Sequence, residues 1–205
     1  MKIAVFGATG RVGTQFVRLA LKEGHQVRAL IRTPEKADHI KGAEWVQGDA
    51  KDPESIEKAL EGCDLVFSGL STDKTDTLSV AVPLIIEEME RQNLKRIVTI
   101  GTAGILNSRY EDGKFRFETS ESKRKLTFAA EQHRNVFEAF SHSNLEWTIV
   151  CPTYLPDGVE QGNVRFEKDY LPEDGKKVTV GDTARFAYDE LWKGEFIGSR
   201  VGICY

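Results

Sequence analysis

The chain has 205 residues, of which 40% are hydrophobic and 29% are charged, and its formal net charge is -4. This length suits one domain, or one domain with a small appended lobe. Mild acidity without a Lys/Arg block argues against nucleic acid or an anionic membrane as a partner. The longest apolar run, Val80–Ile86, is too short to span a bilayer. Because Met1 leads directly into a strand-like run, we expect a cytoplasmic protein without a signal peptide.

The three cysteines, Cys63, Cys151 and Cys204, lie far apart in the chain and form no CxxC pair. An odd number at wide spacing predicts neither a disulfide framework nor a zinc site. Because free cysteine is commonly buried, we expect reduced thiols in the core and no metal centre.

Short apolar runs alternate with segments of helical periodicity. In the first half we expect, in chain order, a strand at Ile3–Phe6, a helix at Val12–Glu23, strands at Gln26–Ile31 and Glu44–Val46, a helix at Pro53–Leu60 and a strand at Asp64–Ser68. The second half predicts a helix at Thr77–Gln92, a strand at Lys95–Ile100, a helix within Glu118–Ser141 from near Ser122, a strand at Glu146–Val150, a helix at Asp182–Trp192 with Asp182 near its cap, and a strand at Arg200–Ile203. Pro83 either kinks its helix or delays the start of that helix.

Strands that alternate with helices predict an α/β fold, here a doubly wound, Rossmann-like parallel sheet with helices on both faces. The nearly continuous apolar strands "IAVF", "DLVFS" and "RIVTI" are typical of strands covered on both sides. We expect residues 1–205 to form a single domain, in which 151–205 are a small C-terminal substrate lobe. The least regular stretches, Ile105–Thr119 and Leu155–Lys177, follow strand carboxyl ends, where open α/β sheets bind ligands.

The first expected strand is followed by "GATGRVG", with glycines at positions 7, 10 and 13. Between a strand and a helix, Gly7 permits a tight turn, Gly10 lets backbone approach a pyrophosphate, and Gly13 lets the helix pack against the sheet. The helix N-terminus offers N–H groups and partial positive charge to the anion. The sequence therefore predicts a nucleotide site with contacts from Gly7, Thr9, Gly10, Arg11, Val12 and Gly13.

The choice of nucleotide depends on the end of the second expected strand, in "HQVRALIRTPEK". NAD sites usually have an acid there that binds the ribose 2′-hydroxyl, and none lies between His25 and Pro34. Arg32 stands there instead, and a guanidinium suits a 2′-phosphate, with Arg11 as a second partner. We therefore expect NADP(H), with NAD(H) less favoured, although Glu35 lies near enough in sequence to pair with Arg32.

Two further turns contribute to the expected cofactor site. Asp49 and Ala50 follow the third strand and are expected at the adenine edge, with a turn or N-cap role for Asp49 as the alternative. Gly69 and Leu70 follow the fourth strand, where small residues let backbone approach the cofactor ribose. A simple turn is the alternative for this second pair.

Several segments carry a family resemblance: "GATGRVG", "LIRTPEK", "GDAKDPESIEKALEGCDLVFSGL", "LKRIVTIGTAG" and "LEWTIVCPTYL". They resemble the atypical short-chain dehydrogenase/reductases, within the NAD(P)H-binding group of NmrA-like proteins, flavin reductases and biliverdin-IXβ reductases. The segment order agrees nearly end to end. The resemblance implies hydride transfer from NADPH to a conjugated, easily reduced acceptor, which needs proximity and stacking more than a strong protein acid.

The sequence departs from the classical members of that family, which use a Tyr-x-x-x-Lys pair. Alignment back from "LEWTIVCP" puts Ala129 at the tyrosine position and His133 at the lysine position, and none of the five tyrosines begins such a motif. A classical carbonyl reductase or epimerase is therefore disfavoured.

The resemblance implies further site residues beside the nicotinamide. Thr102 stands at the family's serine position, where it would hydrogen-bond nicotinamide or acceptor, and His133 would contact ribose or protonate the acceptor with a pKa near neutrality. Turn capping is the alternative for Thr102, and an ordinary surface or core histidine is the alternative for His133. The resemblance also implies contacts with the nicotinamide from four residues after the sixth strand: Pro152, Thr153, Tyr154 and Leu155. Tyr154 is a stacking wall or, equally, a core residue.

Two functions remain open from the sequence. The first is an NADPH-dependent reductase of a planar acceptor such as a flavin, a quinone or a bilin. The second is a non-catalytic NADP(H)-sensing protein that binds a protein partner, which the missing Tyr–Lys pair favours. The polar segment 105–125 lies where a substrate lid would lie and is a candidate partner surface. The sequence leaves the oligomeric state open.

Overall fold

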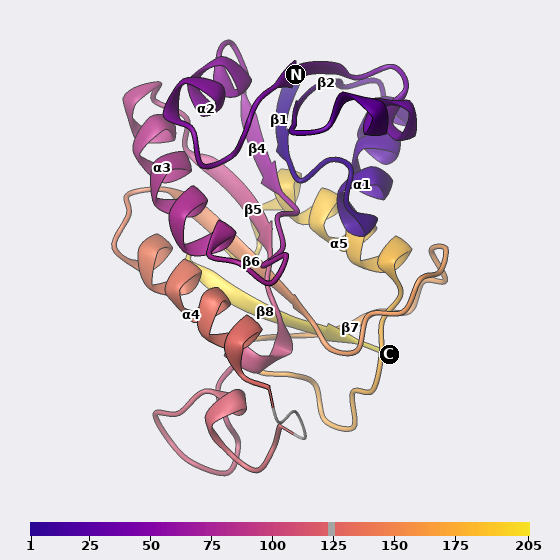
Figure 1. Cartoon of the computed structure of the whole chain (residues 1–205). Coiled ribbons are helices and arrows are strands. Elements are labelled where there is room, and N and C mark those ends of the chain that lie inside the picture. Colours follow the sequence, from indigo (N-terminus) through magenta and orange to yellow (C-terminus); the bar gives the residue numbers. More distant parts are fainter. Residues whose placement is uncertain (123–125) are drawn as a thin grey trace.

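The computed structural model describes residues 1–122 and 126–205, which contain one eight-stranded sheet (Figure 1). The strand order is β3-β2-β1-β4-β5-β6-β8-β7. The strands are Lys2–Phe6 (β1), Gln26–Ile31 (β2), Glu44–Gln47 (β3), Leu65–Ser68 (β4), Arg96–Ile100 (β5), Glu146–Pro152 (β6), Arg165–Lys168 (β7) and Ser199–Cys204 (β8). This order defines a doubly wound, Rossmann-like sheet and confirms the expected fold class.

Helices cover both faces of the sheet (Figure 1). The α-helices of the described residues are Arg11–Lys22 (α1), Pro53–Leu60 (α2), Thr77–Arg91 (α3), Phe128–Ser141 (α4) and Val180–Lys193 (α5), and the 3₁₀-helices are Pro34–Ile40 (η1), Ala103–Ile105 (η2) and Arg116–Glu118 (η3). Buried residues of α2, α3 and α4 share one core, and those of α1 and α5 share the other. The sheet is therefore the middle of three layers.

Strand β1 shows why its apolar run is continuous. Ala4 and Phe6 belong to the core under α2, α3 and α4, whereas Ile3 and Val5 belong to the core under α1 and α5. Successive strand residues point to opposite faces, so a strand covered on both sides must be apolar at each position.

The strand order reverses between β1 and β4, and this position locates the ligand crevice. From β1 the chain moves outward to β2 and β3, and from β4 it moves the other way to β5 and β6. The N–H of Gly69 donates to the carbonyl of Phe6 at 2.9 Å, so the two strands stay joined to their carboxyl ends. In open α/β sheets, ligands bind beyond the carboxyl ends of two neighbouring strands whose following connections lead in opposite directions.

The structure differs from the expected elements in two places. Strand β7 was not predicted, and at this edge of the otherwise parallel sheet it pairs antiparallel with β8; this short, mostly exposed strand lacks an apolar run. The helix expected from near Ser122 begins at Phe128, after residues 123–125, which lie outside the described residues. Asp182 lies near the cap of α5, as expected: the N-cap is Thr179, whose hydroxyl accepts from the Asp182 N–H, and the helix itself begins earlier, at Val180.

Two other expectations are resolved. Helix α3 begins at Thr77 and continues through Pro83, so the proline does not delay its start. Cys63, Cys151 and Cys204 are free and buried, as expected for core thiols. Burial raises the pKa of the Cys151 thiol to about 12, so this group stays protonated and unreactive near neutral pH.

Candidate functional site

The glycine turn after β1 is built around backbone contacts that exclude side chains. Gly7 has φ of 73°, and its carbonyl accepts from the Gly10 N–H at 3.0 Å. A Cβ on Gly7 would lie 2.6 Å from the backbone of Gly69. The turn therefore needs a left-handed residue without a side chain, which fits the predicted tight turn.

Gly13 and Gly10 have different roles in the same turn. A Cβ on Gly13 would lie 2.1 Å from the Gly7 carbonyl oxygen, so helix α1 can sit this close to β1 only with glycine there. A Cβ on Gly10 would meet the same oxygen at 3.2 Å, a milder contact. Gly10 is the N-cap of α1 and has no side-chain cap, so the first N–H groups of the helix are left for another acceptor.

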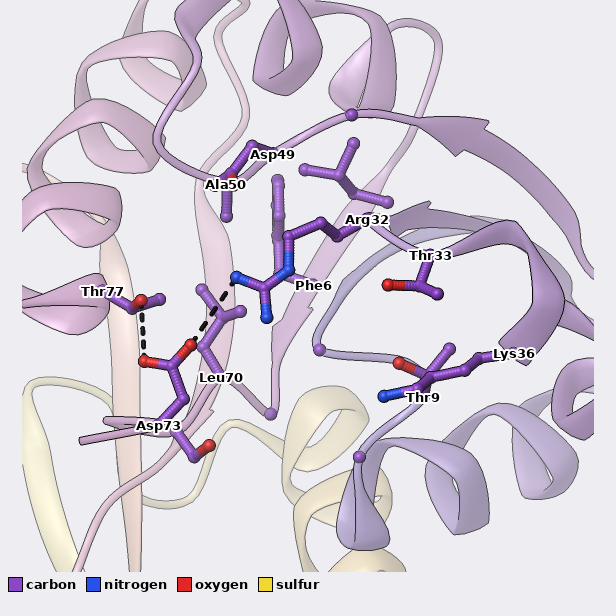
Figure 2. Close-up of a pocket in the computed structure, with 16 residues that line it drawn as sticks. Phe6, Thr9, Arg32, Thr33, Lys36, Asp49, Ala50, Leu70, Asp73 and Thr77 are labelled. Atoms are coloured by element: carbon purple, nitrogen blue, oxygen red, sulfur yellow. Dashed lines mark hydrogen bonds and ion pairs between the residues drawn. The ribbon is translucent and has the colours of Figure 1, made fainter. Parts of the chain in front are cut away.

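A cavity of about 220 Å³ opens on one side of this turn (Figure 2). It is lined by Phe6, Gly7, Thr9, Gly10, Leu30, Arg32, Thr33, Lys36, Gly48, Asp49, Ala50, Gly69, Leu70, Ser71, Asp73 and Thr77. The structure thus brings together the predicted residues that follow β1, β2, β3 and β4. Sequence reasoning missed Thr33, Lys36, Asp73 and Thr77, although the basic Lys36 lies just beyond Arg32 in the chain.

Arg32 extends across this cavity toward the loop between β4 and α3 (Figure 2). Its Nη1 lies 3.6 Å from Oδ2 of Asp73, so Arg32 pairs with Asp73 rather than with the predicted neighbour Glu35. Asp49 lines the cavity, and its Oδ1 accepts from the Lys51 N–H at 2.9 Å, which is the turn role given as its alternative. The cap of α2 is Asp52, not Asp49.

Arg11 lies on the other side of the glycine turn. Its Nη1 donates to Asp157 Oδ1 at 2.9 Å and to the Leu155 carbonyl at 3.0 Å. This ion pair borders a separate cavity that includes Thr9 and Gly10 but not Arg32. The structure therefore does not bring Arg11 to Arg32; Arg11 holds the segment after β6 against α1. The Val12 side chain is buried in the core, so only its backbone can face a ligand.

A second cavity, of about 310 Å³, lies at the carboxyl ends of β5 and β6. It is lined by Thr102, Ala103, Gly104, Arg116, Phe117, Glu121, Ser122, Leu126, Thr127, Ala129, Ala130, Pro152, Thr153 and Tyr154. Thr102, Pro152, Thr153 and Tyr154 were predicted. Sequence reasoning missed Arg116 and Phe117, for which the only signal is the polar character of segment 105–125.

Tyr154 and Thr102, which line this second cavity, each had two alternative roles. Tyr154 is 62% exposed, so the core alternative for it is wrong. The hydroxyl of Thr102 accepts from the Gly104 N–H at 3.4 Å, a long contact that caps η2 weakly. Thr102 therefore lines the cavity and also has its alternative role in the turn.

Arg200, on β8, fixes the start of segment 105–125 over the sheet. It donates to the Ile105 carbonyl, and its Nη2 donates to Asn107 Oδ1 at 2.8 Å. Its guanidinium carbon lies 4.3 Å from the ring centroid of Phe137 and 5.4 Å from that of Phe115. These contacts position the wall of the second cavity from a strand far away in sequence.

Glu121 orders the cavity-facing part of the same segment. Its Oε2 accepts from Ser108 Oγ and from the Arg109 N–H, each at 2.8 Å. Its Oε1 accepts from Arg116 Nε at 3.1 Å. Arg116 and Phe117 both line the second cavity, and a guanidinium carries further N–H donors besides this Nε–H.

His133 differs from its expected chemistry. It is buried on α4, and its Nδ1 has no hydrogen-bond partner among the described residues. The prediction of a pKa near neutrality is wrong, because burial lowers the pKa of His133 to about 4. The imidazole is therefore neutral at physiological pH and is not a ready acid.

The buried imidazole makes stability depend on pH. The folded pKa lies below the unfolded value, so stability is fully present above pH of about 6.5 and falls as the pH approaches 4. Between these pH values we expect the free energy of unfolding of the wild type to fall by up to about 3 kcal/mol. In His133→Leu this part of the pH dependence should be absent. Denaturant unfolding at several pH values measures it, with the exposed His39→Leu as control. Equal pH dependence in wild type and His133→Leu would contradict this result.

A glycine turn at the switch point of a doubly wound sheet, with cavities after the central strands, defines a Rossmann-like dinucleotide-binding protein. The family model described as NAD(P)H-binding matches residues 7–192. The chain therefore belongs to this NAD(P)H-binding family, whose ligand is a nicotinamide dinucleotide, as the sequence resemblance implied.

Curated relatives match only part of the chain. The photosystem II assembly factor Ycf39 of Cyanophora paradoxa is 44% identical over 82 residues, which are 39% of this chain and 26% of that protein. The chain spans less than half the length of such relatives, between 25% and 44%.

Solved structures match the whole chain. A candidate exported protein of Burkholderia pseudomallei is 28% identical with a TM-score of 0.87, and 100% of both chains is covered. A candidate NADH-flavin reductase of Streptococcus pneumoniae is 24% identical with a TM-score of 0.83, covering 100% of this chain and 99% of that one. The anaerobilin reductase ChuY of Escherichia coli O157:H7 is 20% identical with a TM-score of 0.82, covering 100% and 97%. The last two show the shared fold.

Within residues 1–122 and 126–205, no helix has both the length and the apolar character to cross a membrane. No group of three or more His, Cys, Asp or Glu side chains in the same residues is arranged to hold a metal ion.

Proposed function

We propose that this protein is an NADPH-dependent reductase that transfers a hydride to a planar, conjugated acceptor such as a flavin, a quinone or a bilin. The observation that carries the proposal is the pair of cavities at one sheet edge. The first follows β1 to β4 and the second follows β5 and β6, which are neighbouring strands. A dinucleotide that begins in the first cavity would end beside the second.

The first cavity fits the adenosine end of the cofactor. The backbone cradle that Gly7 and Gly13 keep free of side chains suits a pyrophosphate at the N-terminus of α1. Arg32, with Thr33 and Lys36 nearby, supplies the cations and hydroxyl that suit a 2′-phosphate. This donor set favours NADP(H) over NAD(H).

The second cavity fits a flat acceptor. Phe117 and the exposed Tyr154 offer aromatic surface, and the guanidinium of the lining residue Arg116 suits an anionic substituent. When bound, the nicotinamide supplies the hydride. The chain's part is to position the acceptor, since Ala129 replaces the family's tyrosine and neutral His133 is a poor acid. Acceptors that are easily reduced need only such positioning.

A protein-binding role is the second candidate. The relatives named Ycf39 are photosystem II assembly factors, and the chain lacks the catalytic Tyr–Lys pair. In this reading, NADP(H) binding would change affinity for a protein partner, with segment 105–125 as the candidate surface. A partner whose binding differs between NADP⁺ and NADPH, without acceptor-dependent turnover, would favour it.

Cofactor preference and turnover test the reductase proposal. We expect NADPH at 100 times its Kd to raise the free energy of unfolding by about 2.7 kcal/mol, and NADPH oxidation to require an added flavin, quinone or bilin. Arg32→Gln should weaken NADPH binding roughly 10- to 100-fold and NADH binding much less, because a charged hydrogen bond to phosphate contributes about 1.5–3 kcal/mol. The exposed Arg18→Gln, on α1, is the control. Equal losses for both cofactors would contradict the role of Arg32, and no turnover with any acceptor would contradict the reductase.

A further inference from the structure

Asp73 places a carboxylate inside the cavity, opposite Arg32 (Figure 2). It lies in the loop between β4 and α3, with φ of 39°, and the next residue, Lys74, has φ of 63°. Side chains adopt this left-handed region at a cost, so the loop conformation must be held by other contacts.

Two hydroxyls hold the carboxylate in place. Asp73 Oδ1 accepts from Thr75 Oγ1 at 2.6 Å and from Thr77 Oγ1 at 2.9 Å. Thr77 is buried at the start of α3, so this hydrogen bond attaches the loop to the first turn of that helix. These hydrogen bonds, together with the nearby Arg32, lower the pKa of Asp73, which is ionised at neutral pH.

The other oxygen faces the cavity and Arg32. The Arg32–Asp73 contact joins Nη1 and Oδ2 at 3.6 Å, and the side chains are 65% and 34% exposed. The remaining charged groups that line the cavity are Lys36 and Asp49. A 2′-phosphate that reaches Arg32 must therefore displace a carboxylate and remain close to its negative charge.

We propose that Asp73 is a cofactor-specificity residue that weakens NADPH binding and so reduces the preference for NADPH over NADH that Arg32 creates. This inference rests on the proposed function, in which Arg32 binds the 2′-phosphate. The carboxylate competes with the phosphate for the guanidinium and repels its charge, so it penalises NADPH. NADH carries a 2′-hydroxyl at that place, which a carboxylate tolerates and can accept from. The chain therefore binds the two cofactors with more similar affinities than Arg32 alone would give.

The test compares Asp73→Asn with Asp76→Asn in the full chain. Asparagine keeps the shape and the acceptor oxygen of Asp73 but removes the charge. Asp76 is an exposed acid of the same loop that pairs with Lys51 at 3.3 Å, so it controls for the loss of one negative charge. Dissociation constants for NADPH and NADH are measured by calorimetry at low salt.

We expect Asp73→Asn to lower the Kd for NADPH about tenfold and to change the Kd for NADH less than threefold. Asp76→Asn should leave the ratio of the two constants within about twofold of wild type, and added salt should shrink the Asp73→Asn effect. An unchanged ratio in Asp73→Asn, or an equal gain for both cofactors, overturns the inference.

Arg32→Gln separates failure of the inference from failure of the proposed function. If Arg32→Gln reduces the preference for NADPH while Asp73→Asn leaves it unchanged, only the role of Asp73 is wrong. If Arg32→Gln also leaves the preference unchanged, the 2′-phosphate site itself is wrong, and both proposals fail. Failure of the wild-type chain to bind either dinucleotide likewise overturns both.

Discussion

Replacing Gly13 with alanine is expected to weaken dinucleotide binding at least 100-fold. The added Cβ would lie 2.1 Å from the Gly7 carbonyl oxygen. Helix α1 must then move away from β1, and the backbone cradle for the pyrophosphate opens with it. Overpacking of this kind also costs about 1–3 kcal/mol of stability. Calorimetric titration with NADPH and denaturant unfolding measure the two effects on the same sample.

The control for Gly13→Ala is Arg18→Ala on an exposed turn of α1. This change shortens an exposed side chain of the same helix to a methyl group, away from β1, so binding and stability should stay near wild-type values. If Gly13→Ala bound NADPH within a few-fold of wild type, the glycine turn would not be the pyrophosphate site. If Gly13→Ala lost NADPH binding but kept the wild-type free energy of unfolding, the substitution would act only on the backbone that contacts the pyrophosphate.

Glu190→Leu is expected to lower the free energy of unfolding by about 3–5 kcal/mol, because it leaves the Arg96 charge buried without its partner. Arg96 Nη2 donates to Glu190 Oε1 at 2.8 Å, and the two side chains are only 7% and 3% exposed. Glu190 Oε1 also accepts from Thr148 Oγ1 at 2.9 Å and from the Phe196 N–H at 3.0 Å. The network thus joins α5 to β5, β6 and the turn before β8.

Burial, not distance, decides the size of this effect. The exposed pair Arg91–Glu57 is shorter, at 2.6 Å, with side chains 57% and 54% exposed. Glu57→Ala is therefore expected to cost no more than about 1 kcal/mol. The double variant Arg96→Met/Glu190→Leu should recover much of the lost stability, since it removes both buried charges. Equal costs for Glu57→Ala and Glu190→Leu in urea unfolding would contradict this explanation.

The local pattern predicted most of the elements because each depends on neighbours in sequence. Gln26–Ile31 and Pro53–Leu60 have the predicted bounds, since an apolar run and an N-terminal proline fix them locally. Strand β7 was missed because its four residues lack such a run. The start of α4 was placed too early: Glu121, near the expected start, accepts hydrogen bonds from Ser108 and Arg116, and the helix begins at Phe128.

In the candidate site, too, local features were predicted from the sequence and contacts between distant segments were not. The glycine spacing after β1 predicted the turn, because φ and close approach are properties of those few residues. Asp73 opposite Arg32 was not predictable, since the two lie on different loops that only the sheet order brings together. Burial of His133 was not predictable either, because neighbours from other elements remove its water and lower its pKa.

By itself, the sequence determined the doubly wound class and the glycine turn of a nucleotide site, because period, spacing and turn chemistry are encoded over short stretches of chain. The NAD(P)H-binding family was indicated by the resemblance of those stretches to known proteins. Only the tertiary structure decided what surrounds each charge: the partner of Arg32, the clamp made by Arg11, the buried Arg96–Glu190 pair and the Arg116 wall of the second cavity. The physical reason is that electrostatic and solvation energies depend on distance and burial in space. Separation along the chain carries little of that information.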